Sequence, residues 1–398
     1  MNDADADADV VVVGGGPAGA VTAALLARRG RRVVLLERAP AYRWRACGVF
    51  ASPASVVALR GIGLDEAAIA RVARPIPAMR VETAAGTSFR LTYGDGDRLA
   101  APAVGFDRSS LDPLLVALAG KAGADVRPGV AVTAVARGHV TTSGGEIGTR
   151  IVVGADGLRS VVARGFGVAR PARLAPRVGL TFHVADPRPD APRDARMVLF
   201  DGGYVGLAPV PGGRVNVGIV LGGRWLEGLR RDGAESTVEA VLAAIPQAGD
   251  DPVDWRAATR CDPIEGASPL GVRATDRAGD AWLLVGDAAG FLDPFTGEGL
   301  HRALVSARLA AAAVDRALDG DAAALAGYDR AMTRRFRSKD ALSLLVQTFL
   351  ARPALFDYAA RRLAARDRVR ETMGLVMGDL VPATRALDPR FIAALLRP

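Results

Sequence analysis

Cysteine, histidine and lysine are scarce in this chain of 398 residues. The two cysteines, Cys47 and Cys261, are too few for a disulfide scaffold, and three histidines with no Cys/His cluster at zinc spacing argue against a metal site. Only two of the 51 basic residues are lysines. With so much Ala, Gly and Arg, this composition indicates a GC-rich genome. The net charge of +8 therefore does not by itself indicate a nucleic-acid partner, and none is predicted.

One uncharged run is long enough to cross a membrane. Residues 10–27 carry no charge over 18 positions, but the sequence Gly-Gly-Gly-Pro at residues 14–17 would break a spanning helix. Acidic residues precede the run, whereas a secretory signal begins with positive charge. We therefore predict no signal peptide, no transmembrane segment and a cytoplasmic location.

The first forty residues have the pattern of a strand–helix–strand unit. Residues 10–13 form a β-branched run typical of a strand buried on both faces of a parallel sheet. A helix of small residues is expected at 20–29, and a second apolar strand at 32–36 ends at Glu37. A unit of about thirty residues is typical of the βαβ motif.

A glycine motif, Gly14-x-Gly16-x-x-Gly19, joins the first strand to the helix. In such a motif Gly14 permits a tight turn, Gly16 lets the backbone approach a pyrophosphate, and Gly19 lets helix and strand pack closely. The helix N-terminus offers unpaired N–H groups to the phosphates. Glu37 is placed to accept hydrogen bonds from a ribose diol. The motif predicts a dinucleotide but does not choose between NAD and FAD.

Two later strands end in acidic turns. Residues 151–160 hold a buried strand that is followed by Asp156, and residues 282–290 hold a second one that is followed by Asp287. A glycine-rich loop at 294–299 then leads into a helix. With three motifs in this order, the chain resembles the FAD-dependent oxidoreductases of the para-hydroxybenzoate hydroxylase class, and within them the geranylgeranyl reductase-like branch.

The three motifs together span residues 10–303, and no known motif matches the last 70 or so residues. Residues 177–221 have the pattern of short antiparallel strands with Gly/Pro turns. We therefore predict an α/β fold with a Rossmann-type FAD-binding domain, an antiparallel β-sheet substrate domain that interrupts it, and a helical C-terminal segment. The predicted boundaries are residues 1–75, 100–175 and 270–325 for the first, 76–99 and 176–269 for the second, and 326–398 for the third.

The resemblance implies a set of cofactor contacts. Asp287 would bind the ribityl chain, and the backbone of residues 297–300 would face the flavin N1–C2=O edge, where a helix N-terminus stabilises negative charge. Asp156 and Gly157 would serve both FAD and a nicotinamide donor, NADPH or NADH. For Arg108, an exposed arginine at a helix start is the alternative. The residues expected to bind FAD are Gly14, Gly16, Pro17, Ala18, Gly19, Glu37, Arg38, Arg108, Val132, Asp156, Gly157, Asp287, Pro294, Gly297, Glu298, Gly299 and Leu300.

Two residues are candidates for catalysis. Cys47 belongs to a Cys-Gly pair that the reductase-like branch has near the substrate side of the flavin, where it would donate a proton. Val49 departs from that branch, which often has a small or acidic residue after Cys-Gly, and a cysteine that only packs is the alternative. His301 would lie near the flavin pyrimidine; the alternative is a histidine at a helix start that faces solvent. His183 and Tyr204 lie on predicted sheet strands, where they either pack or line a substrate pocket.

A cluster of Arg334, Arg335, Arg337 and Lys339 precedes an apolar run in the C-terminal segment. One interpretation is a basic surface that meets a membrane or a carrier protein, which would make the protein peripheral at the membrane and let that partner present the substrate. The other interpretation is a solvated helix face. The oligomeric state is not predicted.

The favoured function is that of an FAD-dependent oxidoreductase that reduces a C=C bond in a lipophilic small molecule, isoprenoid or polyketide-like, as in secondary metabolism. The first alternative is a monooxygenase that uses NAD(P)H and O2, and the second is a non-redox flavoprotein with structural FAD. Halogenation is disfavoured because the tryptophan motif of flavin halogenases is absent.

Overall fold

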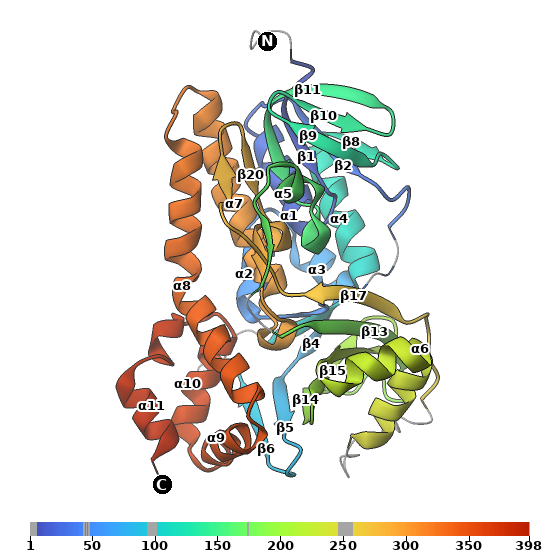
Figure 1. Ribbon diagram of the computed structural model, residues 1–398, viewed down its shortest axis with the longest axis vertical. Coiled ribbons are helices and arrows are strands. Elements are labelled where there is room, and N and C mark those ends of the chain that lie inside the picture. Colours follow the sequence, from blue (N-terminus) through green and yellow to red (C-terminus); the bar gives the residue numbers. More distant parts are fainter. Residues whose placement is uncertain are drawn as a thin grey trace.

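The computed structural model describes residues 6–42, 44, 46, 48–93, 102–172, 175–245 and 258–397, so Cys47 lies outside the described residues. Figure 1 shows a parallel-sheet domain above, a second sheet below it, and the last helices beside the second sheet. The predicted α/β class with an interrupting sheet domain and a helical C-terminal segment is confirmed.

The upper domain is built on an eight-stranded sheet. Its path is β19 (Ala278–Gly279), β20 (Trp282–Leu284), β11 (Gly145–Gly154), β1 (Ala8–Val13), β2 (Val33–Glu37) and β8 (Asp125–Pro128), with β9 (Val132–Ala136) and β10 (His139–Thr142) as an antiparallel extension of β11. β1 runs parallel to both neighbours, so Val10 lies opposite Val33 and Ile151. The β-branched run is therefore buried on both faces, as predicted for a central parallel strand.

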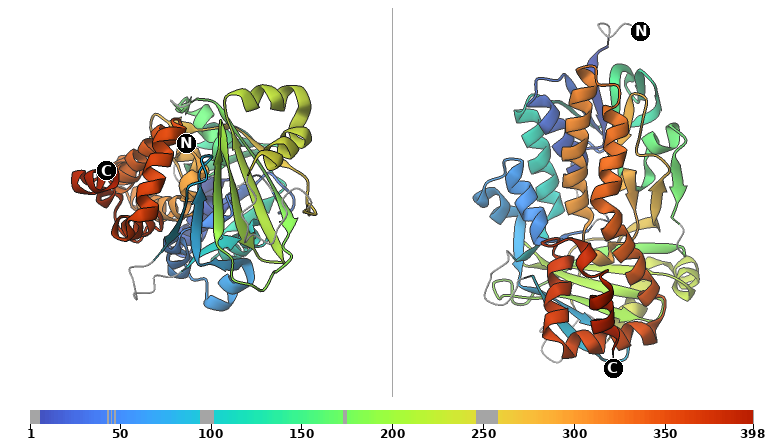
Figure 2. Two further views of the ribbon diagram at one scale, coloured as in Figure 1. Left: turned by 90° about the horizontal axis from the view of Figure 1, so that it is seen from below. Right: turned by 90° about the vertical axis from the view of Figure 1, so that its left-hand side faces the viewer.

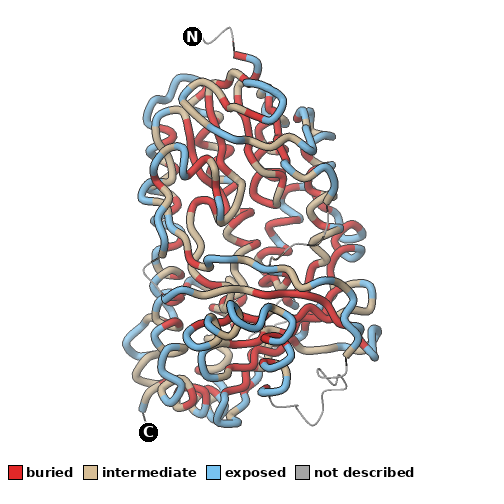
Figure 3. Tube along the Cα trace, turned by 45° about the vertical axis from the view of Figure 1, so that its right-hand side comes forward, coloured by how far each residue is buried: buried red, intermediate tan, exposed pale blue. Residues whose placement is uncertain are grey.

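Helices cover one face of this sheet. Val10, Val12 and Leu35 pack against them, whereas Val11 and Val34 pack on the other side against α5 (Val161–Gly165) and the β9–β10 hairpin. Figure 3 shows the resulting band of buried backbone through the centre of the domain. The covering helices are α1 (Pro17–Ala27), α4 (Arg108–Lys121), α7 (Gly299–Leu318) and the first half of α8 (Ala324–Leu350).

The lower domain is a seven-stranded sheet. Its order is β17 (Glu265–Leu270), β13 (Arg177–Ala185), β16 (Arg214–Leu221), β15 (Gly203–Val210), β14 (Ala195–Phe200), β5 (Ala78–Glu82) and β6 (Ser88–Thr92). All neighbouring strands are antiparallel except β14 and β5, which run parallel. This parallel pair joins the two segments of the domain, which are far apart in the sequence.

The two faces of the lower sheet have different partners, as Figure 2 shows. Val205 and Leu207 pack against α6 (Arg224–Ala244), whereas Tyr204, on the opposite face, packs in a cluster with Ala360 and Leu363 of the C-terminal helices. We call the α6 side the outer face and the other the inner face. The helices on the inner face are α9 (Pro353–Ala365), α10 (Asp367–Met377) and α11 (Pro389–Leu396).

Smaller elements connect the two layers. A Cβ on Gly105 would lie 1.9 Å from the carbonyl oxygen of Pro209, so a small sheet packs closely against the end of β15. That sheet contains β3 (Phe50–Ala51), β7 (Ala103–Phe106) and β4 (Ala73–Ile76), and α2 (Pro53–Gly61) and α3 (Glu66–Val72) follow β3. A fourth sheet contains β12 (Ala169–Pro171), β18 (Val272–Ala274) and β21 (Gly290–Phe291). Single 3-10 turns occur at η2 (Gly157–Arg159), η3 (Gly286–Ala289), η4 (Pro294–Thr296) and η5 (Ala383–Arg385).

The structure differs from the sequence-based expectation in four places. α6, with a kink at Gly233, was not predicted, and the strand expected at residues 151–154 is the end of a strand that begins at Gly145. Residue 326 lies inside α8, whose first half packs on the upper domain. Lys339 is buried rather than part of a basic surface. In the described part of the chain, none of the helices combines the length and the apolar character that a membrane crossing requires.

Candidate active site

The glycine motif lies where β1 ends and α1 begins, at the carboxyl edge of the parallel sheet. Gly14 has φ +104°, in the left-handed region that favours glycine. A Cβ on Gly19 would lie 1.9 Å from the Gly14 carbonyl oxygen, so only glycine lets helix and strand pack this closely. A Cβ on Gly16 would meet no atom within 4 Å. Open space therefore lies at the start of α1, whose first residues are Pro17 and Ala18.

Glu37, the last residue of β2, is buried and holds the glycine loop. Its Oε2 accepts a hydrogen bond from the Gly15 N–H (2.9 Å), and its Oε1 accepts one from the Ala39 N–H (2.9 Å). The Tyr42 hydroxyl donates to the Gly15 carbonyl at 3.2 Å. The carboxylate therefore fixes the loop, in addition to the ribose contact that the resemblance implies. Arg38, next in the chain, is exposed.

Asp156 follows β11 and lies beside the glycine loop, because a Cβ on Gly14 would be 2.9 Å from the Asp156 Cα. Its carboxylate accepts hydrogen bonds from the Ser160 hydroxyl (2.6 Å) and the Val161 N–H (2.6 Å). Asp156 therefore fixes the start of α5. Burial raises the pKa of Asp156, and these hydrogen bonds oppose that rise. The side-chain position of Gly157 is open, with no atom within 4 Å.

Asp287 lies in η3, directly after β20. None of the described residues forms a hydrogen bond or an ion pair with its carboxylate. Burial raises the pKa of Asp287, and the charges of Arg108 and Arg302 oppose that rise. Asp287 itself is half-buried, and a partly desolvated carboxylate without a protein partner is stabilised when a ligand supplies hydrogen bonds. Asp287 is therefore suited to receive ligand hydroxyl groups.

The loop before α7 supplies a second group of this kind. Within the described part of the chain, the Thr296 hydroxyl is buried without a hydrogen-bond partner. Gly297 has φ +64°, and a Cβ there would lie 2.5 Å from the ring of Phe50. A Cβ on Gly299 would meet no atom within 4 Å, so open space lies at the N-terminus of this 20-residue helix. The unpaired N–H groups of its first turn favour an electron-rich oxygen.

These features fit a bound FAD. Open space at Gly16 and Gly299 adjoins two helix N-termini, which suit a pyrophosphate and the flavin carbonyl edge respectively. The unpartnered polar groups of Asp287 and Thr296 are satisfied when a ligand hydrogen-bonds to them.

Asp293, which the sequence analysis did not single out, ties this loop to the lower sheet. Its Oδ1 accepts hydrogen bonds from the Tyr204 hydroxyl (2.6 Å) and the Phe295 N–H (2.9 Å), and its Oδ2 pairs with Arg177 Nη1 (2.8 Å). Tyr204 also packs edge-to-face on Phe295, with ring centroids 5.2 Å apart. The Asp-Pro pair at Pro294, directly before a glycine-rich turn, was the available signal for a capping aspartate.

For Arg108 and Val132, the structure shows contacts and positions within the protein that do not by themselves indicate FAD binding. Arg108 begins α4, and its guanidinium pairs with Asp112 at 2.7 Å and donates to the Gly48 carbonyl at 3.3 Å. Its side chain is only 14% exposed, so the alternative of an exposed arginine is wrong. Val132 begins β9, in the hairpin that extends β11.

His301 lies in the first turn of α7 and is buried, so the alternative of a solvent-facing histidine is also wrong. Its Nε2 is 3.1 Å from Nη2 of Arg335 on α8. Burial lowers the pKa of His301, and the charge of Arg335 lowers it further. The ring thus contacts the C-terminal segment, which does not favour a catalytic role.

His183 lies on the inner face of the lower sheet, against the loop that follows β2. Its Nδ1 is 2.6 Å from Asp262 Oδ2, and its ring meets Trp44 edge-on with centroids 4.2 Å apart. Burial lowers the pKa of His183, while Asp262 opposes that change. Trp44 therefore lies next to the inner face, three residues before Cys47 in the chain.

Comparisons with known proteins agree with this geometry. A family model described as "FAD binding domain" matches residues 7–339. The chain belongs to this family. The flavoprotein is 31% identical over 347 residues to digeranylgeranylglycerophospholipid reductase 2 from Methanopyrus kandleri, and the alignment covers 79% of this chain and 78% of the relative. It is 29% identical over 322 residues to menaquinone reductase from Mycolicibacterium smegmatis, and that alignment covers 76% of this chain and 75% of the relative. The flavoprotein is therefore an FAD-dependent oxidoreductase of the para-hydroxybenzoate hydroxylase class.

Solved structures confirm the fold. A flavoprotein/dehydrogenase from Cytophaga hutchinsonii superposes with a TM-score of 0.80 at 20% identity, covering 96% of this chain and 95% of that one. A flavin-dependent brominase superposes with a TM-score of 0.78 at 19% identity, covering 93% of each chain. At such identities the likeness shows the architecture and does not distinguish between reactions.

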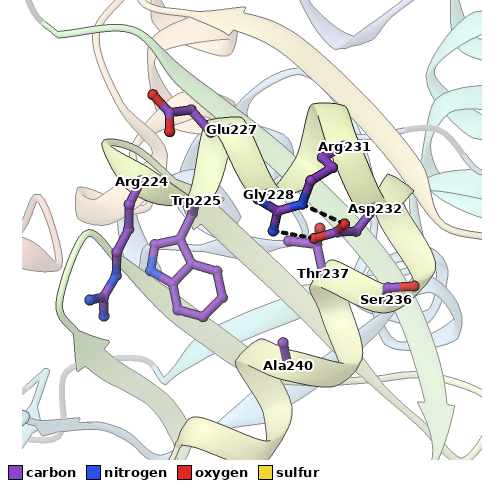
Figure 4. Close-up of a pocket in the computed structure, with 9 residues that line it drawn as sticks. All are labelled: Arg224, Trp225, Glu227, Gly228, Arg231, Asp232, Ser236, Thr237 and Ala240. Atoms are coloured by element: carbon purple, nitrogen blue, oxygen red, sulfur yellow. Dashed lines mark hydrogen bonds and ion pairs between the residues drawn. The ribbon is translucent and has the colours of Figure 1, made fainter.

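Figure 4 shows a surface groove on α6, lined by residues such as Trp225, Arg231 and Thr237. Arg231 pairs with Asp232 at its rim. Because α6 covers the outer face of the lower sheet, this groove lies on the side opposite to Tyr204 and the loop before α7. It is not part of the cofactor site.

Proposed function

We propose that this flavoprotein reduces C=C bonds in an isoprenoid chain or another lipophilic molecule. The observation that carries the proposal is the identity of about 30% to two groups of reductases, over at least three quarters of both chains. Both sets of relatives are named reductases, of menaquinone in one case and of a digeranylgeranylglycerophospholipid in the other. For this flavoprotein we propose the same type of reaction, reduction of a C=C bond, on the same class of substrate, a lipophilic molecule.

We propose that FAD is held by the groups whose geometry fits it. Gly14, Gly16 and Gly19 would give the pyrophosphate access to the start of α1, Asp287 would hold the ribityl hydroxyl groups, and residues 297–300 would face the flavin N1–C2=O edge. When bound, the cofactor supplies hydride transfer. NADPH or NADH is the proposed electron donor.

The inner face of the lower sheet is the proposed substrate surface. Met197, Leu199, Tyr204 and Val220 lie in one apolar cluster on this face. The C-terminal helices pack on this cluster, so a substrate would bind at its border rather than across it. Tyr204 contacts Asp293 in the loop before α7, which supports a substrate position between the cluster and the proposed flavin site. Apolar side chains there suit a lipophilic substrate, because its burial is driven by removal of apolar surface from water.

Turnover is expected to proceed without oxygen. Reduction of a C=C bond needs only hydride and a proton, whereas a monooxygenase consumes O2 in proportion to product. The measurement is product formation from a polyprenyl substrate and NADPH or NADH in an anaerobic chamber, with O2 uptake recorded in a parallel aerobic assay. If product forms only in the presence of O2, and one O2 is consumed for each product molecule, the monooxygenase alternative would be established. Bound FAD that neither nicotinamide reduces would support structural FAD.

Replacement of Asp287 is expected to weaken FAD binding. Asp287→Ala removes a half-buried acceptor for ligand hydroxyl groups. A hydrogen bond to a charged group is worth roughly 1.5–3 kcal/mol, or about 10- to 100-fold in affinity. Cys261→Ala is the control, because Cys261 is exposed and lies outside the flavin motifs. Flavin absorbance after gel filtration measures the retained cofactor. Equal retention by both variants would remove Asp287 from the site.

A further inference from the structure

A buried cluster of charges lies where the C-terminal segment meets the start of α7. Its centre is Lys339 on α8, which is 5% exposed. The ammonium Nζ is 3.0 Å from the Val376 carbonyl oxygen, 2.8 Å from Asp379 Oδ1 and 3.9 Å from Glu298 Oε2. One side chain thus contacts the end of α10, the second residue after that helix, and the residue that precedes α7.

Asp379 links Lys339 to the start of α2. Its Oδ1 pairs with Lys339, and its Oδ2 accepts a hydrogen bond from the Ser52 hydroxyl at 2.9 Å. Ser52 precedes the first turn of α2 and closely follows Gly48 in the chain. Asp379 adopts φ +57°, a left-handed conformation that is unfavourable for a residue with a Cβ. A strained backbone conformation persists where surrounding contacts hold the residue in place. For Asp379 these contacts are the ion pair with Lys339 and the hydrogen bond from Ser52.

Glu298 links Lys339 to the proposed flavin site at the start of α7. It directly precedes α7, and its Oε1 is 3.3 Å from Arg302 Nη2 and 3.5 Å from the Ser343 hydroxyl. Burial raises the pKa of Glu298, whereas the charges of Arg302 and Lys339 lower it. The carboxylate is therefore kept close to the flavin loop by two cations from α7 and α8.

The use of lysine here is chemically specific. Of the 51 basic residues only Lys121 and Lys339 are lysines, and Lys121 lies exposed at the end of α4. An ammonium is a compact point charge that can donate in three directions, whereas a guanidinium is a larger planar fork. The three acceptors around Lys339 come from two parts of the chain, residues 376–379 and Glu298, and lie in different directions, which suits the compact group.

We infer that Lys339 is a positioning residue that couples the C-terminal segment to the flavin. Through Asp379 and Glu298 it fixes the starts of α2 and α7, and its charge favours electron uptake at the end of the flavin that faces α7. The family model ends at residue 339, so Lys339 is its last matched residue, and the partners Val376 and Asp379 lie in the part of the chain beyond it. The inference rests on the proposed position of FAD.

The test is the midpoint potential of FAD bound to the full-length protein, measured by dye equilibration without any substrate. Lys339→Met removes a cation, which disfavours the negatively charged reduced flavin. We expect about a tenfold lower ratio of reduced to oxidised FAD at a given potential, or about 30 mV for a two-electron couple. Glu298→Gln removes an anion of similar size and should shift the ratio in the opposite direction. Lys121→Met is the matched control and should not change it.

The opposite signs separate electrostatic coupling from general damage to the fold. Unchanged potentials in both variants, or shifts in one direction, would overturn the inference. If Lys339→Met does not fold, the nearly isosteric Glu298→Gln decides alone: a raised potential supports the inference and an unchanged one overturns it. A wild-type protein that takes up no FAD would overturn the proposed function and this inference together. Potentials that fail to move in a protein that binds FAD would overturn only the inference.

Discussion

Gly16→Val is expected to yield a folded protein that no longer holds FAD. The position has φ −71° and ψ −179°, which valine adopts without strain, and the protein leaves open space within 4 Å of an added Cβ. The valine side chain would fill the space through which the pyrophosphate approaches the N–H groups at the start of α1. Loss of one or two charge-assisted hydrogen bonds, at roughly 1.5–3 kcal/mol each, lowers affinity by at least about tenfold before steric exclusion adds to it.

Gly19→Ala is the matched variant, and it should damage the fold rather than the cofactor site alone. Its Cβ would lie 1.9 Å from the Gly14 carbonyl oxygen, which is backbone and cannot rotate away. Overpacking of this kind costs about 1–3 kcal/mol or more. Thermal unfolding of the apoprotein and flavin absorbance after gel filtration separate the two effects: Gly16→Val should keep its Tm, and Gly19→Ala should lose several degrees. A Gly16→Val protein with wild-type FAD content would contradict the proposed pyrophosphate site.

The parts of the fold that sequence predicts well are those set by short-range rules. α2 begins at Pro53, which fits the first helical position, and the chain turns after it at Gly63 (φ +103°). The three turns after β1, β11 and β20 follow from glycine and aspartate at the ends of apolar strands. Parallel strands place their carboxyl ends at one edge of a sheet, so these turns lie close together.

The remainder depends on contacts between distant segments. Asp293 acquires its importance from Tyr204 and Arg177, which lie 89 and 116 residues away in the chain. Lys339 was grouped with neighbouring arginines, but its partners on α10 decide its burial. The parallel pairing of β14 with β5 likewise joins segments more than 100 residues apart, and no local pattern encodes it. For these features, the sequence shows which residue types are present, but it does not show which distant residues they contact.

Cys47→Ser is expected to slow conversion of substrate much more than reduction of the bound FAD by NADPH or NADH. If the thiol delivers a proton to carbon during C=C reduction, only the second half-reaction requires it. General acid catalysis typically contributes about 100- to 10,000-fold, and a serine hydroxyl is a far weaker acid than a thiol. Trp44, in the same loop, packs against His183 on the inner face, and the Gly48 carbonyl accepts a hydrogen bond from Arg108. Trp44 therefore adjoins the inner face, and Gly48 adjoins the start of α4.

Stopped-flow absorbance of the flavin measures the two half-reactions of this variant separately. The control is Cys261→Ser, which changes an exposed cysteine and should leave both rates at the wild-type level. A cysteine that only packs predicts the reverse pattern, with a lower Tm and nearly intact turnover, because serine keeps the size but adds a polar group. An unchanged rate of substrate reduction in a well-folded Cys47→Ser protein would therefore exclude proton donation by this residue. Another group, or water, would then have to supply the proton that C=C reduction requires.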